Sequence, residues 1–302
     1  MNDTIKEKSL LWIEDLYKVY GDKVVLDDID LAVATGEIVT VVGPSGCGKS
    51  TLLRLILGQE FPTRGTMLIE GEPIGFADHT RGIVYQRYSL FRHRTVLGNV
   101  LEGPRLSLPF FERRRREKEL IDEAKDFLEK VQLSQDLNKY PHELSGGMKQ
   151  RVAIAQSLIM KPKILLMDEP FGALDPSTRQ SMQLFLLELW EDLGMTIFFV
   201  THDLEEAVFL GTRIIVLSHQ YLDDRGEGRD VKRGSKVIAD HPLPVKAKSV
   251  DVKKTGQFGE LIEEIRLEVD VRHKRHVKDF NLKHPFSWRT IREEEFKPPE
   301  GS

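Results

Sequence analysis

The chain has 302 residues, of which 40% are hydrophobic and 30% charged, with a formal net charge of −4. This composition is typical of a globular protein with one large core, and the net negative charge argues against nucleic acid as the main ligand. A single cysteine excludes an internal disulfide, and no apolar run approaches the ~18 residues that cross a bilayer, so a function at a membrane would need spanning helices from another chain.

The N-terminal part predicts strands followed by a loop and a helix. Residues 11–42 alternate apolar and polar side chains, with turn signals at Gly21-Asp22 and Gly36, which indicates an antiparallel β-ribbon. A short apolar run then leads directly into a glycine-rich loop, and the residues after this loop predict a helix from Lys49 to about Leu57. Two further strands are predicted, at residues 65–69 and 82–85.

The glycine-rich loop fits the phosphate-binding pattern G-x-x-x-x-G-K-[ST], with a strand before it and a helix after it. Its residues are Gly43, Pro44, Ser45, Gly46, Cys47, Gly48, Lys49 and Ser50, and we include Thr51 with them as nucleotide-binding. Glycines allow backbone N–H groups to curl around a phosphate, and the helix adds the positive end of its dipole. We expect Lys49 to reach the β- and γ-phosphates and the Ser50 hydroxyl to ligate Mg²⁺. We interpret Cys47 as a spacer that offers a handle for thiol reagents.

The middle of the chain predicts a helical subdomain of about residues 88–162, inserted into the sheet domain. From about residue 110 to 133 the sequence is highly charged, and its apolar residues recur at helical spacing. The basic run Arg113–Arg116 is interpreted as an exposed helix face in preference to a lipid or nucleic-acid site. A serine followed by two glycines, Ser145-Gly146-Gly147, predicts the start of a further helix whose N–H groups and dipole face an anion.

After residue 163 strands and helices alternate, which predicts a parallel sheet with crossover helices. The expected elements are strands at 164–167, 196–200 and 213–217 and helices at 178–193 and 204–210. Asp168 and Glu169 end the first of these strands, so their carboxylates are expected at the carboxyl edge of the sheet, where ligands bind. We expect Asp168 to hold Mg²⁺ and Glu169 to act as the base that orients or deprotonates water.

The composition changes near Tyr221, and we place a boundary between residues 1–224 and a C-terminal extension, 225–302. The extension predicts one strand at 237–239, one amphipathic helix at 258–269 and a loosely ordered end. We interpret it as a solvated appendage, with regulation by a bound metabolite or partner as the alternative.

Together these motifs resemble the ATP-binding subunits of ABC transporters over roughly residues 11–220. The signature Leu144-Ser145-Gly146-Gly147-Met148-Lys149-Gln150-Arg151 is most similar to that of the bacterial nitrate, sulfonate and taurine importer group. The resemblance implies an α/β fold of the P-loop NTPase class, ABC type, with a mixed, mainly parallel core sheet, an antiparallel β subdomain and an inserted helical subdomain. It also implies ATP hydrolysis with Mg²⁺.

Four further site residues follow from this resemblance. Tyr20 is similar to the aromatic that stacks on adenine, with Tyr17 as the second choice. Gln86 resembles the glutamine that contacts Mg²⁺, and His202 the histidine that contacts the γ-phosphate. Asp175 ends Phe171-Gly172-Ala173-Leu174-Asp175, which resembles the loop that crosses the dimer interface.

The resemblance also implies partners. Because the chain contains one phosphate loop and one signature, we expect a head-to-tail dimer of two such ATPases, each signature closing over the ATP of the other. The dimer would drive an integral-membrane permease served by an extracytoplasmic solute-binding protein, as a peripheral component at the cytoplasmic face of the inner membrane. Residues 90–94 depart from the group, which usually has a Leu-Pro-Trp-type segment there. The alternatives are the ATPase of an exporter or lipid-trafficking system, or an ABC protein acting on nucleic acid or ribosomes.

Overall fold

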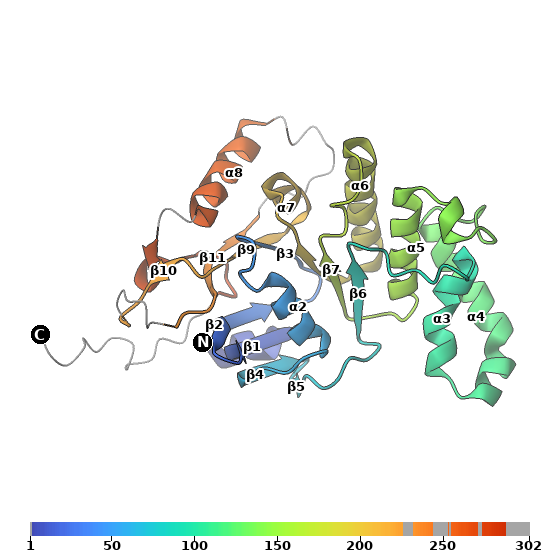
Figure 1. Cartoon of the computed structure of the whole chain (residues 1–302), viewed down its shortest axis with the longest axis horizontal. Helices are drawn as coiled ribbons and strands as arrows, with labels where there is room; N and C mark the ends of the chain where they lie inside the picture. Colours follow the sequence, from blue (N-terminus) through green and yellow to red (C-terminus); the bar gives the residue numbers. More distant parts are fainter. Residues whose placement is uncertain (1, 226–231, 244–252, 254, 271–273, 288–302) are drawn as a thin grey trace, which may run out of the picture. The chain divides into compact units, whose positions relative to one another are not determined.

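The computed structural model describes residues 2–225, 232–243, 253, 255–270 and 274–287 (Figure 1). The chain folds as two compact units, one formed by residues 1–77 with 198–302 and the other by residues 78–197. The second unit is therefore an insertion in the sequence of the first. Residues 224 and 225, on either side of the proposed boundary, both belong to the first unit.

An antiparallel sheet of four strands opens the first unit, in the order β2-β1-β4-β5. It is preceded by helix α1, Asn2–Lys8. The strands are β1 (Leu11–Tyr20), β2 (Lys23–Val33), β4 (Arg64–Ile69) and β5 (Glu72–Pro73). β1 and β2 are joined by the turn at Gly21-Asp22, so the prediction of an antiparallel ribbon is confirmed for residues 11–33. It is wrong for residues 38–42, which form a strand of a different sheet and pair in parallel there. The alternating apolar side chains of the ribbon form a core that includes Leu11, Ile13, Leu16, Ile29 and Leu31.

A second, mixed sheet runs through the first unit in the strand order β13-β11-β9-β3-β8. These strands are β3 (Ile38–Val42), β8 (Thr196–Val200, of which the last three residues belong to this unit), β9 (Arg213–Ser218), β11 (Lys236–Pro242) and β13 (Asn281–Leu282). β3 and β9 are parallel, whereas β11 is antiparallel to β9. The helices of this unit are α2 (Lys49–Leu57), α7 (Leu204–Leu210) and α8 (Gly256–Val269). α8 packs against α7 and β9 (Figure 1).

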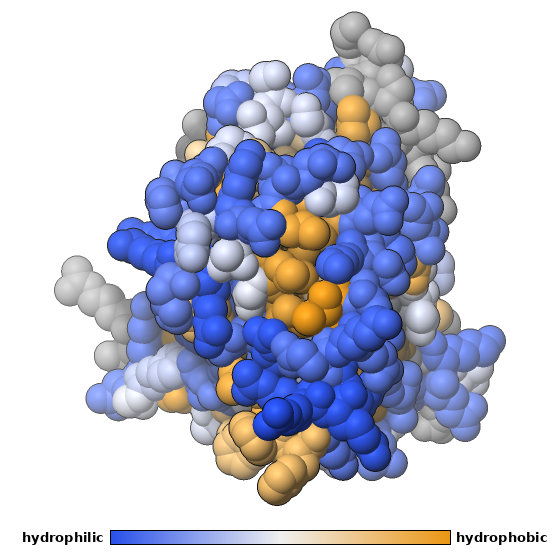
Figure 2. Space-filling model, turned by 90° about the vertical axis from the view of Figure 1, so that its right-hand side faces the viewer, coloured by the Kyte–Doolittle hydropathy of each residue, from blue (hydrophilic) through white to orange (hydrophobic). Residues whose placement is uncertain are grey.

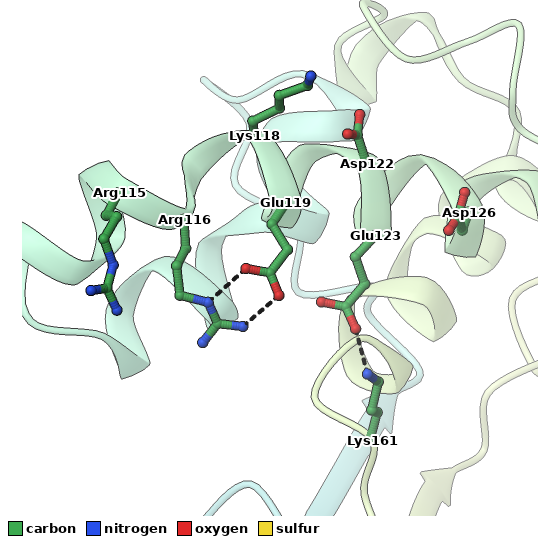
Figure 3. A pocket seen from close by; sticks show the side chains of 8 residues that line it. All are labelled: Arg115, Arg116, Lys118, Glu119, Asp122, Glu123, Asp126 and Lys161. Atoms are coloured by element: carbon green, nitrogen blue, oxygen red, sulfur yellow. Dashed lines mark hydrogen bonds and ion pairs between the residues drawn. The ribbon is translucent and has the colours of Figure 1, made fainter.

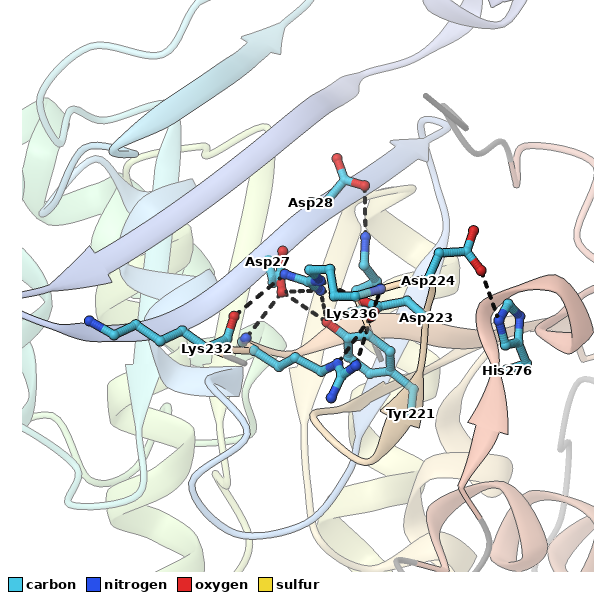
Figure 4. A network of polar contacts seen from close by, with 11 residues as sticks. Asp27, Asp28, Tyr221, Asp223, Asp224, Lys232, Lys236 and His276 are labelled. Carbon is cyan, nitrogen blue, oxygen red and sulfur yellow. Dashed lines mark hydrogen bonds and ion pairs between the residues drawn. The ribbon is translucent and has the colours of Figure 1, made fainter. Parts of the chain in front are cut away.

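Strand β11 and one face of α8 are buried in this unit, so the interpretation of the C-terminal extension as a solvated appendage is wrong for these two elements. Strand β10 (Tyr221–Leu222) pairs with β12 (Arg275–His276), and a 3₁₀ turn, Val277–Asp279, follows. Polar contacts tie the extension to β2 (Figure 4). Asp27 accepts hydrogen bonds from the Tyr221 hydroxyl at 2.9 Å and from the Gly234 amide at 3.2 Å, and Lys236 pairs with Asp28 at 2.7 Å. Burial raises the pKa of Tyr221 well above its usual range, so this hydroxyl stays a donor. Residues 288–302, the main part of the expected loose end, lie outside the described residues.

The second unit contains two parallel strands, three helices that fall within the predicted subdomain of about residues 88–162, and a further helix, α6, that lies outside it. Strands β6 (Arg81–Tyr85) and β7 (Ile164–Asp168) pair in register. The helices are α3 (Val96–Ser107), α4 (Phe110–Lys130), α5 (Gly146–Leu158) and α6 (Pro176–Leu193), with a 3₁₀ turn at Pro141–Glu143. α5 lies at the centre, because it contacts α3, α4, α6 and β6 (Figure 1). Among the described residues, none of the helices combines the length and the apolar character that crossing a membrane requires.

Candidate functional site

The phosphate loop follows β3, whose five residues are all buried. Gly46 and Gly48 have φ of +78° and +91°, a left-handed conformation that glycine adopts without a steric penalty. A Cβ at Gly48 would lie 2.9 Å from Leu26 Cδ2, so only glycine lets the loop pass this close to β2. Left-handed glycines in such a loop turn N–H groups toward a common centre, which forms a concave site for an anion.

Helix α2 begins at the end of this loop without a side-chain cap. Its N-cap is Gly48, which has no side-chain acceptor, and no acidic residue lies in the first turn. The positive end of the helix dipole is therefore not offset by a carboxylate of the same helix, an arrangement that suits a phosphate. The structure thus gives the loop and helix the local geometry expected from the sequence.

Lys49 places its charge within the loop. Its side chain is 9% exposed, and the ammonium donates to the carbonyl oxygens of Gly43 at 2.7 Å and Pro44 at 3.1 Å. Cys47 is also buried, at 1% exposure, with its sulfur 3.8 Å from the Lys49 ammonium. Burial raises the pKa of the Cys47 thiol, and the nearby ammonium offsets this only in part. The expectation that Cys47 offers a handle for thiol reagents is therefore wrong for the loop in this conformation, whereas its interpretation as a spacer stays a prediction.

His202 lies in the turn between β8 and α7, next to the strand that leads into the loop. The Thr201 amide donates to the Val41 carbonyl at 3.3 Å, which brings the carboxyl ends of β8 and β3 together. The Thr201 hydroxyl binds Glu206 at 2.6 Å, and Asp203 caps α7 by accepting from the Glu206 amide at 3.1 Å. These contacts hold the turn in place, while His202 itself is exposed.

Tyr20 lies at the end of β1, with 41% of its surface exposed. Its hydroxyl donates to Glu60, and the Lys18 ammonium lies 4.8 Å from the ring centroid. The hydrogen bond from Tyr20, with further contacts from Lys18 and Arg54, lowers the pKa of Glu60 to about 2. The ring of Tyr17 likewise has a cation over it, the Arg64 guanidinium at 4.4 Å from the centroid, but Tyr17 is only partly exposed. Of the two tyrosines, Tyr20 therefore has the more accessible ring.

In the second unit, parallel pairing brings three predicted site residues to one sheet edge. Tyr85 of β6 is opposite Asp168 of β7, and Gln86 and Glu169 each follow one residue later. A Cβ at Gly172 would lie 3.0 Å from Gln86 Nε2, so the Gln86 amide lies against the loop that follows Glu169. Glu169 has φ of +47°, which costs a non-glycine residue roughly 1–3 kcal/mol and is typical of functional sites.

The signature glycines have a packing role that the sequence reasoning missed. Ser145 is exposed and caps α5, with its hydroxyl accepting from the Met148 amide at 3.3 Å. Gly147 is buried, and a Cβ there would lie 2.7 Å from the Thr178 methyl group of α6. A Cβ at Gly146 would meet Leu174 Cδ2 at 3.0 Å. The sequence reveals that these glycines are special, but only the approach of α6 shows why a side chain is excluded.

The loop Phe171–Asp175 is fixed at both ends. Asp175 caps α6 by accepting from the Thr178 amide at 3.0 Å, and this bonding lowers the pKa of Asp175. Arg179 donates to the carbonyl oxygens of Phe171 at 3.3 Å and Leu174 at 3.1 Å. Arg179 was not among the predicted site residues, and nothing in the sequence reveals that it holds this loop.

Comparison with known proteins places this geometry in a family. The ABC transporter family model matches residues 26–172. The nitrate import ATP-binding protein NrtD of Synechocystis sp. is 48% identical over 212 residues, covering 69% of this chain and 77% of NrtD. The chain belongs to the ABC transporter ATP-binding proteins. The sulfate/thiosulfate import ATP-binding protein CysA of Rhodopseudomonas palustris is 41% identical over 222 residues, which cover 72% of this chain and 63% of CysA.

A solved structure of this ABC family has the same architecture. The cbiO1 protein of Clostridium perfringens, described as part of the ABC transporter complex cbiONQ, aligns with a TM-score of 0.66 and 27% identity, covering 87% of this chain and 96% of cbiO1. The fold class and the resemblance predicted from the sequence are confirmed, and the ABC chain described here is an ATPase.

The residues of this ABC ATPase fit its nucleotide. The phosphate loop supplies left-handed glycines, an uncapped helix start and the buried Lys49 ammonium, which together suit a polyphosphate. Ser50, Gln86 and Asp168 offer a hydroxyl, an amide and a carboxylate oxygen, the kinds of ligand that Mg²⁺ takes from proteins. The chemistry of these residues therefore suits both ATP and Mg²⁺.

Proposed function

We propose that this chain is the ATP-hydrolysing subunit of an importer for a small anionic solute of the nitrate, sulfonate or taurine class. The observation that carries the proposal is the phosphate loop with its buried lysine, in a chain 48% identical to a nitrate import ATP-binding protein. The similarity to a sulfate/thiosulfate import protein supports a small oxyanion as the transported solute. Both relatives are named for import, which favours this direction of transport.

Each proposed site residue has a role that follows from its chemistry. Lys49 and the loop amides hold the β- and γ-phosphates, and Tyr20 stacks on adenine through its accessible ring face. Bound Mg²⁺, held by Ser50, Asp168 and Gln86, would neutralise phosphate charge. Glu169 accepts the proton of the attacking water or orients it, and His202 contacts the γ-phosphate.

The proposal includes a head-to-tail dimer of two such chains. Ser145 is exposed at the N-terminus of α5, so its hydroxyl and the helix dipole are available to a phosphate of another subunit. The chain has one phosphate loop, which makes a second copy the simplest source of that phosphate. Asp175, in the loop fixed by Arg179, would lie at the same interface. ATP binding would favour the closed dimer and hydrolysis would release it.

The remaining partners follow from the relatives. As an importer subunit, the chain would act on an integral-membrane permease, with an extracytoplasmic solute-binding protein in the same system. It would lie at the cytoplasmic face of the inner membrane as a peripheral component. The cbiO1 protein, which is part of a transporter complex, supports this kind of assembly.

The dimer is tested with the substitution Glu169→Gln. This variant keeps the side chain's size but removes the base, so it should bind ATP and remain in the closed state. We expect size-exclusion chromatography with light scattering to show a stable dimer with ATP and Mg²⁺. The double variant Lys49→Ala/Glu169→Gln is the matched control and should stay monomeric. A Glu169→Gln chain that remains monomeric with ATP and Mg²⁺, even beside its permease, contradicts the dimer.

The transport role is tested by purifying the tagged chain from gently solubilised native membranes and identifying what accompanies it. A multi-helix permease, with an extracytoplasmic binding protein encoded or isolated with it, supports the importer. Recovery without a membrane protein, or with ribosomes or DNA, overturns the importer and leaves the ATPase in place.

A further inference from the structure

The end of α3 and the start of α4, on either side of the turn between them, expose three large apolar side chains. Leu106 is 72% exposed, Phe110 69% and Phe111 84%, and Phe111 is the most exposed large apolar side chain of the described residues. The two phenyl rings pack edge to face, with centroids 5.7 Å apart. Single exposed apolar residues are common on proteins, but three of them at the end of one helical hairpin indicate a binding surface.

Arginines lie directly behind these rings on α4. Residues three and four apart in a helix are surface neighbours, so Arg113 and Arg114 flank Phe110, and Arg114 and Arg115 flank Phe111. Between residues 105 and 118 the chain carries six basic and two acidic side chains. Figure 2 shows the result as an orange cluster at the lower end of the surface, bordered by deep blue. We call residues 106–115 the hairpin tip.

Charge is balanced elsewhere on α4 but not at the tip. Arg116 pairs with Glu119 at 2.8 Å and Lys161 with Glu123 at 2.5 Å, beside Asp122 and Asp126, on a shallow face of mixed sign (Figure 3). Arg105 pairs with Glu117. Among the ion pairs of the described residues, none involves Arg113, Arg114 or Arg115. The excess positive charge is therefore concentrated next to the exposed rings.

We propose that the hairpin tip binds the surface of a bilayer that contains anionic lipids. The apolar rings form the extremity, and the arginines lie just behind them, the order that insertion at the boundary of headgroups and acyl chains requires. Long arginine side chains can keep their guanidinium groups at the level of lipid phosphates while their stems cross apolar surface. A single-stranded nucleic acid would instead follow a basic groove with stacking rings, and the tip is a convex turn. This binding is additional to the proposed transport function and requires neither nucleotide nor a partner subunit.

The test is flotation of the purified full-length chain with vesicles of phosphatidylcholine alone or with 30% phosphatidylglycerol. We expect binding to the anionic vesicles only. Phe110→Ser/Phe111→Ser should lower the partition coefficient about tenfold or more. Arg113→Gln/Arg114→Gln/Arg115→Gln should do the same, because each basic side chain near an anionic surface contributes a factor of about five. Phe76→Ser is the matched control, since Phe76 is 79% exposed in the first unit, and it should leave binding unchanged.

A second measurement reports insertion. A tryptophan at the tip, in Phe111→Trp, should show a blue-shifted emission and quenching by acyl-brominated lipid when anionic vesicles are added. Basal ATPase activity should stay unchanged in all the tip variants, because none of these residues lies in the proposed nucleotide site. Equal binding to both vesicle types, binding that survives loss of both phenylalanines, or tighter binding to an RNA oligonucleotide than to vesicles would overturn the proposal.

Discussion

Two side chains of the phosphate loop share one small buried volume. The Lys49 ammonium donates to the Gly43 carbonyl at 2.7 Å and lies 3.8 Å from the Cys47 sulfur. A thiol reagent can therefore reach Cys47 only if the loop opens, and the raised pKa of this thiol further limits the reactive thiolate. Because Cys47 is the single cysteine, its reactivity reports directly on the loop.

We expect iodoacetamide to label the native chain at least about tenfold more slowly than the urea-unfolded chain at the same pH. Because the pKa of the thiol is raised in the fold, the native rate should rise about tenfold per pH unit through pH 8 and 9, and it should fall when ATP and Mg²⁺ are added. Mass spectrometry of timed samples measures both rates, and Cys47→Ser, which has no thiol, gives the background. Native and unfolded chains labelled at equal rates would show that Cys47 is accessible after all.

At the scale of elements, the start of α5 and the start of α6 form one packed piece. Gly147 of α5 faces the Thr178 methyl, and Thr178 in turn donates its amide to the cap Asp175. Arg179 then fixes the loop before α6. These contacts link the signature to the loop Phe171–Asp175.

The substitution Gly147→Ala tests this packing. A Cβ 2.7 Å from Thr178 Cγ2 overpacks a buried site, which typically costs about 1–3 kcal/mol, so the melting temperature should fall. Thr178→Ser removes that methyl group and keeps the amide that Asp175 caps, so the double variant should regain most of the loss. Gly259→Ala in α8, where nothing lies within 4 Å, is the control and should be neutral or slightly stabilising. Scanning calorimetry of the wild-type chain and the three variants measures these melting temperatures. A double variant no more stable than Gly147→Ala would show that the contact with Thr178 is not the cause of the loss.

The sequence predicts the elements whose pattern is local. Helix α2 begins and ends at the residues expected, Lys49 and Leu57, because a glycine and a continuous apolar face mark it. Helix α3 was not predicted, since Gly98, Gly103 and Pro104 interrupt its apolar spacing. Helix α1 was also missed, because its buried side chain Ile5 packs into a cluster most of whose other members are distant in sequence. That cluster contains Trp12, Ala32, Leu68 and Phe286.

The same distinction applies to the candidate site. The phosphate loop and the pair Asp168–Glu169 are contiguous motifs, so the sequence identifies them together with their chemistry. The position of His202 beside β3, in contrast, depends on the contact of Thr201 with Val41, 160 residues away in the chain. Such contacts follow from sheet topology, which single-sequence patterns do not determine.

At the scale of the whole chain, Arg213 joins the two ends of the first unit. Its side chain is completely buried and binds both oxygens of Asp240 at 2.7 and 2.6 Å, the Ala32 carbonyl at 2.6 Å and Glu37 at 3.2 Å. The sequence did not reveal that Arg213 joins these segments. Strand β11, which carries Asp240, has few apolar residues, and Arg213 lies in a different strand from Asp240. The extension is thus part of the structure that contains the phosphate loop.

We expect Asp240→Asn to destabilise the chain by up to about 3–5 kcal/mol, the typical cost of removing one partner of a buried ion pair, because Arg213 then loses its two-pronged carboxylate partner and keeps the longer contact with Glu37. Denaturant unfolding measures this loss. Glu263→Gln is the matched control, because it removes an exposed pair with Arg266 and should change stability by less than about 1 kcal/mol. Similar losses in both variants would show that the Arg213 contacts are not special. A chain that ends at residue 224 lacks Asp240 and should be destabilised in the same way.

The contacts of Arg213 also bear on the order in which the parts of the chain can fold during synthesis. The Ala32 carbonyl precedes Arg213 by 181 positions, and at roughly 5–20 residues per second the ribosome needs about ten to forty seconds to cover that distance. Residues 78–197, in contrast, form a unit that is contiguous in the chain. The inserted unit can therefore complete its contacts before the C-terminal strands of the first unit, which include β9 and β11, have been synthesised. Nascent chains of this protein thus carry an incomplete phosphate-loop unit while these 181 residues are synthesised.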